Sequence, residues 1–192
     1  MSEDQFLDWC DSDTWAEWVD GELIVMSPVS IEHATLATFL VRLLGDFVEA
    51  RDLGTTHQEP FQVRLPEQRR RRSPDLFFVA AARRKLIQKH HVEGAPDLIV
   101  EIVSPESQAR DWREKYLEYE AAGVREYWVI DPSSQRMEAY ALTSKRGYVR
   151  LDEKDGRIAS KVLSGLYIRP AWLWRTPLPK VRTILAEFES KR

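Results

Sequence analysis

The chain has 192 residues, of which 43% are hydrophobic, and its formal net charge is −3. That length supports one substantial core, so we expect a single domain over residues 1–192. The single cysteine, Cys10, excludes a disulfide framework and a cysteine-rich zinc site. No run reaches the about 18 apolar residues of a membrane span, and the first residues lack the pattern of a signal peptide, so we expect a cytoplasmic protein without a membrane partner.

The first half of the chain carries the patterns of a hairpin, a helix and a strand. Strand-forming residues flank a turn dipeptide at Asp20-Gly21, apolar residues recur with helical spacing after Ser30, and Pro60 marks an edge or a bend. We therefore expect a β-hairpin over residues 15–26, a helix over 31–51, one strand over 56–65 and an arginine-rich loop at 69–72.

The second half of the chain alternates between strand and helix patterns. Ser104-Pro105 is typical of a helix start, and Gly123 is typical of a left-handed helix cap. We expect strands at 75–80, 98–103, 126–130, 137–142 and 148–151, a short helix or irregular connection at 81–90, helices at 104–122 and 180–189, and extended segments over 162–174.

One acid lies inside an apolar strand. Glu101 interrupts Leu98-Ile99-Val100-Glu101-Ile102-Val103, a run otherwise suited to the middle of a sheet. Burying an unpaired carboxylate costs on the order of several kcal/mol, so Glu101 must be ion-paired, hydrogen-bonded, protonated or bound to a metal. Asp75 begins another short apolar run. Two acids at the ends or kinks of adjacent strands could share one divalent cation.

These two acids suit phosphodiester hydrolysis if a lysine accompanies them. The reaction needs a hard cation, an oriented water and a positive group that offsets the charge developing on the phosphate. The simplest pattern has a lysine two residues after the second acid, on the same sheet face, but Val103 occupies that position. The following helix offers Lys115 instead, which shares a helix face with Asp111 and Tyr119.

Several motifs carry a resemblance to a known family. They are Asp20-Gly21-Glu22-Leu23, Ser27-Pro28 with His33, Ser73-Pro74-Asp75, the run Gly94 to Ser107, the set Asp111, Lys115 and Tyr119, and the run Gly123 to Pro132. In order and spacing, these motifs resemble the Uma-type putative restriction endonucleases of the PD-(D/E)xK superfamily. The resemblance covers about residues 6–166, so we take these as the core of the domain and residues 167–192 as a C-terminal extension.

This resemblance implies a restriction-endonuclease-like α/β fold, in which a mixed β-sheet is flanked by α-helices, with an N-terminal β-hairpin and additional C-terminal strands. It implies that Asp75 and Glu101 bind a metal and that Lys115 is a catalytic lysine moved from the strand to the helix. The carbonyl of Ile102 is a candidate third ligand. We expect Mg²⁺, with Mn²⁺ as a substitute, and DNA as the substrate. Cutting both strands of a duplex favours a homodimer.

Each of these residues also has a purely structural interpretation. Asp75 could cap its strand beside the arginines. Glu101 could form a buried ion pair with Lys115 and bind no metal. Lys115 could be an ordinary helix-surface lysine paired with Asp111 four residues earlier.

Further candidates are auxiliary. Glu22 and His33 could be metal or water ligands, but a solvated strand residue and a helix-terminal histidine describe them equally well. The resemblance adds Asp111 and Tyr119 to this auxiliary group. The arginines could contact phosphates near the cleaved bond, or could form a solvated loop that offsets the repulsion between the acids; they are Arg69, Arg70, Arg71 and Arg72.

The function that follows from these expectations is metal-dependent endonucleolytic hydrolysis of DNA. The alternative is a catalytically silent module on the same fold, which binds nucleic acid or mediates oligomeric interactions. Fold alone does not decide between these classes, because function depends on the site.

Overall fold

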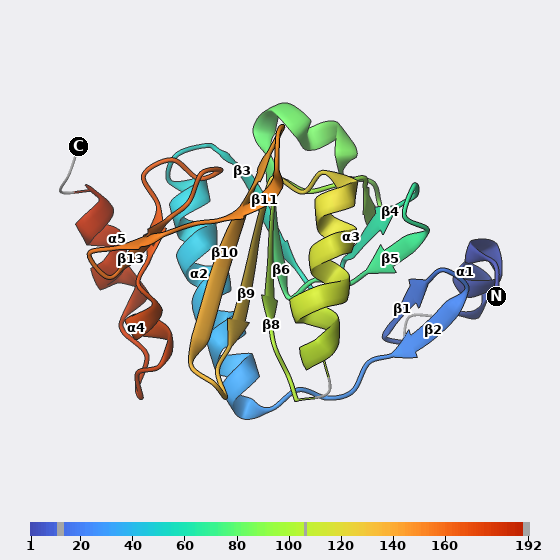
Figure 1. Cartoon of the computed structure of the whole chain (residues 1–192), viewed down its shortest axis with the longest axis horizontal. Helices are drawn as coiled ribbons and strands as arrows, with labels where there is room; N and C mark the ends of the chain where they lie inside the picture. The colour runs from blue at the N-terminus through green and yellow to red at the C-terminus, as the bar shows by residue number, and fades with distance from the viewer. Residues whose placement is uncertain (11–13, 106, 190–192) are drawn as a thin grey trace.

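A mixed six-stranded sheet forms the centre of the computed structural model (Figure 1), which describes residues 1–10, 14–105 and 107–189. The strand order is β11-β10-β9-β8-β6-β3, with β8 parallel to β9 and the other neighbours antiparallel. The strands are β3 (Gly54–Gln58), β6 (Leu76–Ala80), β8 (Leu98–Ile102), β9 (Glu126–Asp131), β10 (Arg136–Thr143) and β11 (Gly147–Arg150). The expected mixed sheet is thus confirmed.

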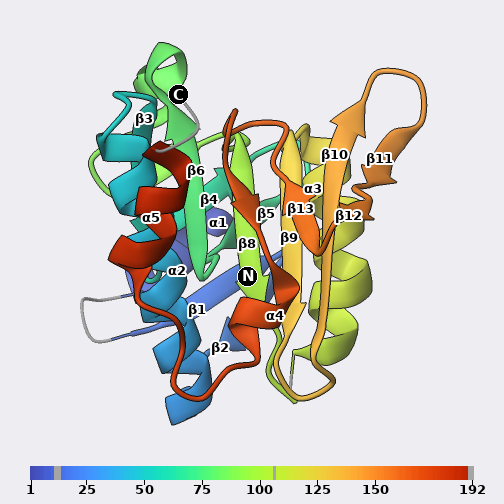
Figure 2. The same ribbon diagram turned by 90° about the vertical axis from the view of Figure 1, so that its left-hand side faces the viewer.

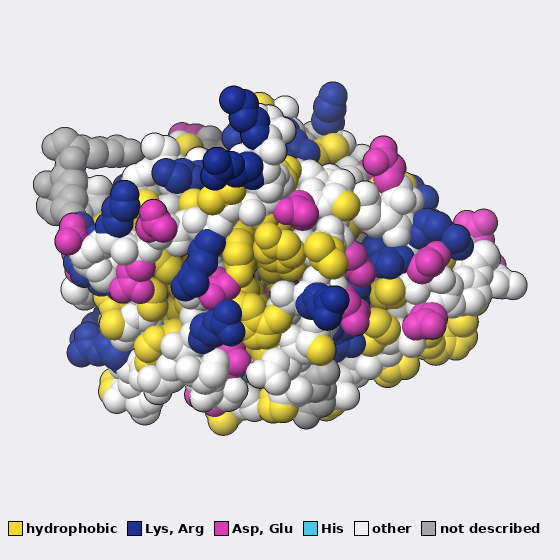
Figure 3. Space-filling view, in the orientation of Figure 1, with side chains coloured by type: hydrophobic (Ala, Val, Ile, Leu, Met, Phe, Trp, Pro, Cys, Tyr) yellow, Lys and Arg dark blue, Asp and Glu magenta, His cyan; other side chains and the backbone are white. Residues whose placement is uncertain are grey.

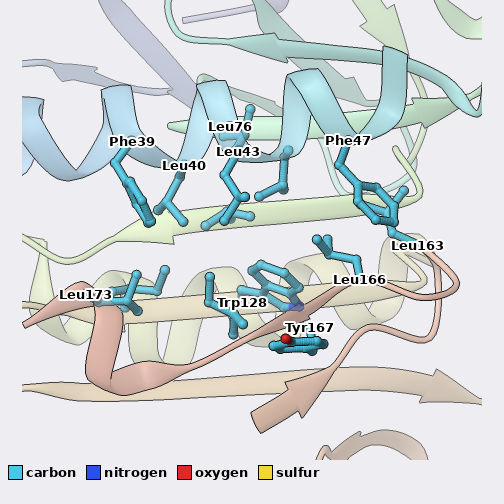
Figure 4. Packing of buried hydrophobic residues seen from close by; sticks show 14 of the residues in the cluster. Phe39, Leu40, Leu43, Phe47, Leu76, Trp128, Leu163, Leu166, Tyr167 and Leu173 are labelled. Carbon is cyan, nitrogen blue, oxygen red and sulfur yellow. The ribbon is translucent and has the colours of Figure 1, made fainter. Parts of the chain in front are cut away.

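Two helices cover the two faces of this sheet. α2 (Ile31–Glu49) packs on one face, and α3 (Lys115–Ala122) lies on the opposite face, as Figures 1 and 2 both show. The helical spacing of the apolar residues of α2 directs Leu40, Leu43 and Phe47 toward the sheet, where they belong to one core cluster with Leu76 and Trp128 (Figure 4). Burial of this stripe is the main source of stability for α2, as for most helices in proteins.

A second, smaller sheet lies beyond α3. Its order is β2-β1-β5-β4-β7, and its first two strands form the expected N-terminal hairpin. The strands are β1 (Ala16–Val19), β2 (Glu22–Val25), β4 (Gln62–Leu65), β5 (Arg70–Arg72) and β7 (His91–Glu93). The prediction of an arginine-rich loop was wrong for Arg70–Arg72, which form the central strand of the sheet, whereas Arg69 lies in the preceding turn. Ion pairs with surrounding carboxylates allow the side chains of Arg71 and Arg72 to be buried there.

Two further predicted elements need correction. The single strand expected over 56–65 is two strands, β3 and β4, which belong to different sheets and are separated by a turn at Glu59–Phe61. The helix expected from Ser104 contains a π-helical turn, η2 (Arg110–Glu114), directly before α3. Residue 106 of this predicted helix lies outside the described residues. Gly123 ends α3 with φ 85°, as predicted for a left-handed cap.

Short elements complete the fold, and some of them were not predicted. They include three helices, α1 (Glu3–Trp9), α4 (Pro170–Leu173) and α5 (Val181–Glu189), and the 3₁₀ helix η1 (Ala81–Leu86). Three short strands form a third sheet, namely β12 (Glu153–Lys154), β13 (Arg157–Ala159) and β14 (Tyr167–Ile168). The closing helix was therefore predicted correctly, whereas α4 is helical where only extended chain was expected. Residues 190–192 of the C-terminal extension lie outside the described part.

The C-terminal elements share the core of the central sheet. Trp172, Leu173, Ile184 and Phe188 belong to the same hydrophobic cluster as α2, and the rings of Phe47 and Phe188 meet edge to face at 5.4 Å between centroids. Across the described ranges, we find no helix with both the length and the apolar character needed to cross a bilayer.

Acid should weaken the attachment of α1. The hydrogen bond from Arg64, at 2.6 Å, is the main cause that lowers the pKa of Glu3 to about 2 from its usual 4.5. Because the folded-state pKa is depressed, this ion pair stabilises the fold above about pH 4.5, and the contribution is lost as the pH falls toward about 2. We expect Glu3→Gln to unfold at a lower urea concentration than wild type above about pH 4.5. This difference in urea midpoint should disappear as the pH falls toward about 2. Asp4→Asn, at an exposed neighbour, should show no such closing gap.

Candidate metal-dependent active site

Asp75 lies at the start of β6, where three groups converge. Its Oδ2 accepts a hydrogen bond from the backbone N–H of Ile102 at 2.6 Å, and its Oδ1 lies 3.2 Å from Nε2 of His33. The same Nε2 lies 3.1 Å from the carbonyl oxygen of Ile102. Because a carbonyl oxygen only accepts, Nε2 is the protonated nitrogen. The structure thus brings together Asp75, Ile102 and His33, which were predicted separately.

Glu101 lies beside Asp75 on the neighbouring strand and is 2% exposed. Its Oε2 is 2.9 Å from Nζ of Lys115, and its Oε1 accepts a hydrogen bond from the hydroxyl of Tyr119 at 2.7 Å. Lys115 also lies 2.9 Å from Oδ1 of Asp111. The side chain of Lys115 therefore reaches the strand acid from the helix, and it is not a surface lysine.

The π-helical turn helps to position this group. Asp111 lies in this turn and Lys115 directly follows it, so that the ammonium of Lys115 lies between Asp111 and Glu101 and both side chains of the pair are almost completely buried. The hydroxyl of Tyr127 donates to the carbonyl of Asp111 at 2.8 Å, and the hydroxyl of Ser107 donates to the Asp111 carboxylate. Such local widening of a helix is frequent at functional sites.

Burial and neighbouring charges shift the pKa values of these groups. Burial raises the pKa of Glu101 to about 8, although the charge of Lys115 opposes this shift. Burial alone would lower the pKa of Lys115, but Asp111 and Glu101 raise it above its usual value. Burial would also lower the pKa of His33, which the hydrogen bond with Asp75 raises. Burial therefore disfavours the charged form of Glu101, and the positive charge of Lys115 acts against that effect.

A second layer of charged residues, which sequence reasoning missed, supports this group from the smaller sheet. Arg72 is fully buried, and its guanidinium lies 2.8 Å from Glu17 and 2.8 Å from Glu118. Burial alone would raise the pKa of Glu17, but the charges of Lys115 and Arg72 lower it. The sequence did contain one indication that Glu17 is buried. Glu17 lies between Ala16 and Trp18 in a short strand, just as Glu101 lies between apolar neighbours.

The arginine run does not present a basic face. Arg71 is 5% exposed and lies 2.6 Å from Glu3, and Arg70 lies 2.9 Å from Glu118. Arg69 is exposed and pairs with Asp20 at 3.0 Å. The solvated-loop interpretation is therefore wrong for Arg71 and Arg72, and their burial is incompatible with direct phosphate contact. Basic and acidic side chains are also interspersed over the face shown in Figure 3.

The site opens into a cleft with a volume of about 640 Å³. The cleft is lined by His33, Asp75, Glu101, Ile102, Asp111 and Lys115, together with Arg110 and Glu59, which were not predicted. Burial, followed by the charge of Asp75, raises the pKa of Glu59 to about 7. Two auxiliary candidates are not cleft-lining residues: Glu22 is exposed on β2, and Tyr119 lies behind Glu101.

The donor atoms fit a hard divalent cation. Within the described ranges, no group of three or more His, Cys, Asp and Glu side chains is arranged to hold a metal. The candidate donors are instead the carboxylates of Asp75 and Glu101 and the carbonyl of Ile102. Mg²⁺ is commonly held by one or two carboxylates while it keeps several waters, so this oxygen-rich set suits Mg²⁺ and does not suit zinc.

The fold and the arrangement of acids at its central strands define a restriction-endonuclease-like protein. The Uma2 family, described as "Putative restriction endonuclease", matches residues 3–171. The chain therefore belongs to the Uma2 family.

A solved structure supports the assignment of the fold. The crystal structure of a putative nuclease belonging to DUF820 from Anabaena variabilis ATCC 29413 is similar to this chain, with a TM-score of 0.75 and 19% identity. The similarity covers 91% of this chain and 97% of the other. At this identity, the comparison establishes the fold alone. Among proteins of curated description, none matches this chain.

Proposed function

We propose that this protein is a divalent-metal-dependent endonuclease that hydrolyses phosphodiester bonds in DNA. One observation supports this proposal above all: Asp75 and Glu101 lie side by side on adjacent strands, in an open cleft, with Lys115 2.9 Å from Glu101. Asp75, Glu101 and the Ile102 carbonyl would hold Mg²⁺, with Mn²⁺ as a substitute. When bound, the cation would polarise the phosphate and lower the pKa of an attacking water.

The residues of the chain have distinct roles in this proposal. Lys115, held between Glu101 and Asp111, provides a fixed positive charge for the water and for the phosphate oxygen that gains negative charge. His33 orients Asp75 through its Nε2 proton. Tyr119 holds one oxygen of Glu101, which leaves the other oxygen facing the lysine. Because these groups are already oriented, little reorganisation is needed during the reaction.

Arg110 is a suitable contact for the substrate. It lines the cleft, and its buried Nε has no hydrogen-bond partner in the described part of the chain. A guanidinium in this position can donate to a phosphate oxygen. We further propose that two copies of the chain cooperate in cutting a duplex, since each copy provides one such site.

The direct test is cleavage of supercoiled plasmid with Mg²⁺, Mn²⁺ or EDTA. We expect metal-dependent nicking and linearisation by wild type and by Asp46→Asn, an exposed control on α2, but none by Asp75→Asn. Linearisation without an accumulating nicked form would support paired sites. DNA retardation in a gel without cleavage under any metal would instead support the catalytically silent binding module.

Metal should also stabilise the folded protein. A cation that binds only the native state raises the free energy of unfolding by about 2.7 kcal/mol when its concentration is 100 times its Kd. We expect Mg²⁺ to raise the melting temperature of wild type and Asp46→Asn, and to leave that of Asp75→Asn unchanged. Differential scanning calorimetry over a magnesium series measures this. A wild-type melting temperature that does not depend on magnesium would contradict the proposed metal dependence.

A further inference from the structure

A second groove begins where the cleft ends, at the first turn of α2. Ser30 and His33 line the cleft. Ile31, Thr38 and Arg42 share one face of α2 and line the second groove, which has a volume of about 630 Å³. Because Ile31 stands between Ser30 and His33 in the chain and is 84% exposed, the groove and the cleft meet at this turn.

The start of α5 forms the other wall of this groove. α5 lies beside α2 on the same side of the central sheet, as Figures 1 and 2 show. Lys180 and Arg182 line the groove from α5 and the residue before it, and Phe39 and Leu178 add apolar side chains to the lining. The groove, named the α2–α5 groove from here on, therefore combines an apolar lining with cations from two helices.

The cations of the α2–α5 groove are not neutralised by the fold. Arg42, Lys180 and Arg182 are exposed, and none of them forms an ion pair within the described part of the chain. The described residues that line the groove include neither Asp nor Glu.

The placement of two of these cations is unfavourable for α5 itself. Lys180 and Arg182 lie at the amino end of the helix, where the helix dipole is positive and acidic residues stabilise, but the first turn of α5 contains no acid. An anionic partner in the groove would offset this unfavourable charge.

We propose that the α2–α5 groove binds the phosphate backbone of the DNA that leaves the cleft. The inference rests on the proposed function, because it gives the same substrate a path across the surface. From His33 to Arg42 the distance along α2 is about 14 Å, at about 1.5 Å of rise per residue. Phosphates of one strand are about 3.4 Å apart along a duplex, so the groove contacts the backbone roughly four base pairs from the cleaved bond. Such contacts position DNA without reading its sequence.

Duplex binding tests this assignment without any need for turnover. We would measure the fluorescence anisotropy of a labelled duplex in Ca²⁺ and in EDTA over a series of salt concentrations, with full-length protein. The groove variant is Arg42→Gln/Lys180→Gln/Arg182→Gln. The control variant removes the same charge from exposed positions outside the groove and is Lys145→Gln/Arg146→Gln/Lys154→Gln.

We expect the groove variant to bind DNA at least about tenfold more weakly than wild type at about 0.1 M salt. The slope of log K against log salt should fall by about 2 to 3, since each lost phosphate contact removes about 0.9. The control variant should bind like wild type. Both variants should melt at the wild-type temperature, because the substituted side chains are exposed and form no ion pair.

The outcomes separate this inference from the proposed function. Plasmid cleavage by wild type, together with wild-type duplex affinity and salt slope in the groove variant, would overturn the inference and leave the function standing. Equal losses of affinity in the groove and control variants would also overturn it, because overall charge would explain them. A changed sedimentation coefficient of the groove variant with unchanged DNA affinity would instead assign the groove to contact between copies. A wild type that neither binds duplex nor cleaves plasmid would overturn both proposals.

Discussion

Lys115→Met should reduce DNA cleavage by about 100-fold to 1,000-fold, the usual cost of removing one group that stabilises developing charge. It should also lower the free energy of unfolding by about 3–5 kcal/mol, because Glu101 and Asp111 lose the buried cation that they share. Plasmid cleavage and urea unfolding measure the two effects. Lys89→Met, at an exposed position, should change neither.

A double variant separates the catalytic loss from the stability loss. In Lys115→Met/Glu101→Gln, the buried carboxylate is neutralised together with its partner, so much of the lost stability should return. Activity should not return, because both the lysine and a metal ligand are missing. If Lys115→Met cleaves plasmid at the wild-type rate, the lysine has only a structural role.

Arg72→Met should be among the most destabilising single changes in the chain. The guanidinium is fully buried between Glu17 and Glu118, so its removal leaves two carboxylates without a compensating charge. Breaking a buried pair from one side costs about 3–5 kcal/mol. We expect a loss of that size in urea unfolding, with partial recovery in Arg72→Met/Glu17→Gln.

The same strand region offers a matched control. Arg69 pairs with Asp20 at 3.0 Å, but both side chains are more than half exposed. Exposed ion pairs contribute about 0–1 kcal/mol, so Arg69→Met should shift stability by no more than that. Equal losses in Arg69→Met and Arg72→Met would contradict the assignment of Arg72 as a buried link between the smaller sheet and α3.

The acids of the central sheet could be predicted from the sequence because their local context is unusual. Glu101 stands inside an apolar strand and Asp75 at the start of another, and the structure places both in one cleft. The position of Lys115 was harder to predict, because a π-helical turn that no sequence pattern indicated lies directly before its helix. The sequence offered Lys115 in place of the strand lysine and the motif resemblance gave it a catalytic role, but only the packing of the helix decided that its side chain reaches Glu101.

Other members of the site could not be predicted because their partners are distant in the sequence. Arg72 meets Glu17 across 55 residues and Glu118 across 46 residues. A run of arginines has the local pattern of a solvated loop, and only these partners make its burial favourable. Glu59 was overlooked because only the fold brings it into the same cleft as Asp75.

The sequence by itself determined the family, the N-terminal hairpin, the long α2 helix and the two strand acids, since each depends on local periodicity or on a contiguous motif. Only the tertiary structure decided that Arg72 is buried, that Lys115 reaches Glu101, and that Glu59 lines the same cleft as Asp75. These features depend on the pairing of strands and on the packing of α3 against two sheets. Such long-range contacts have no counterpart in the spacing of residues along the chain.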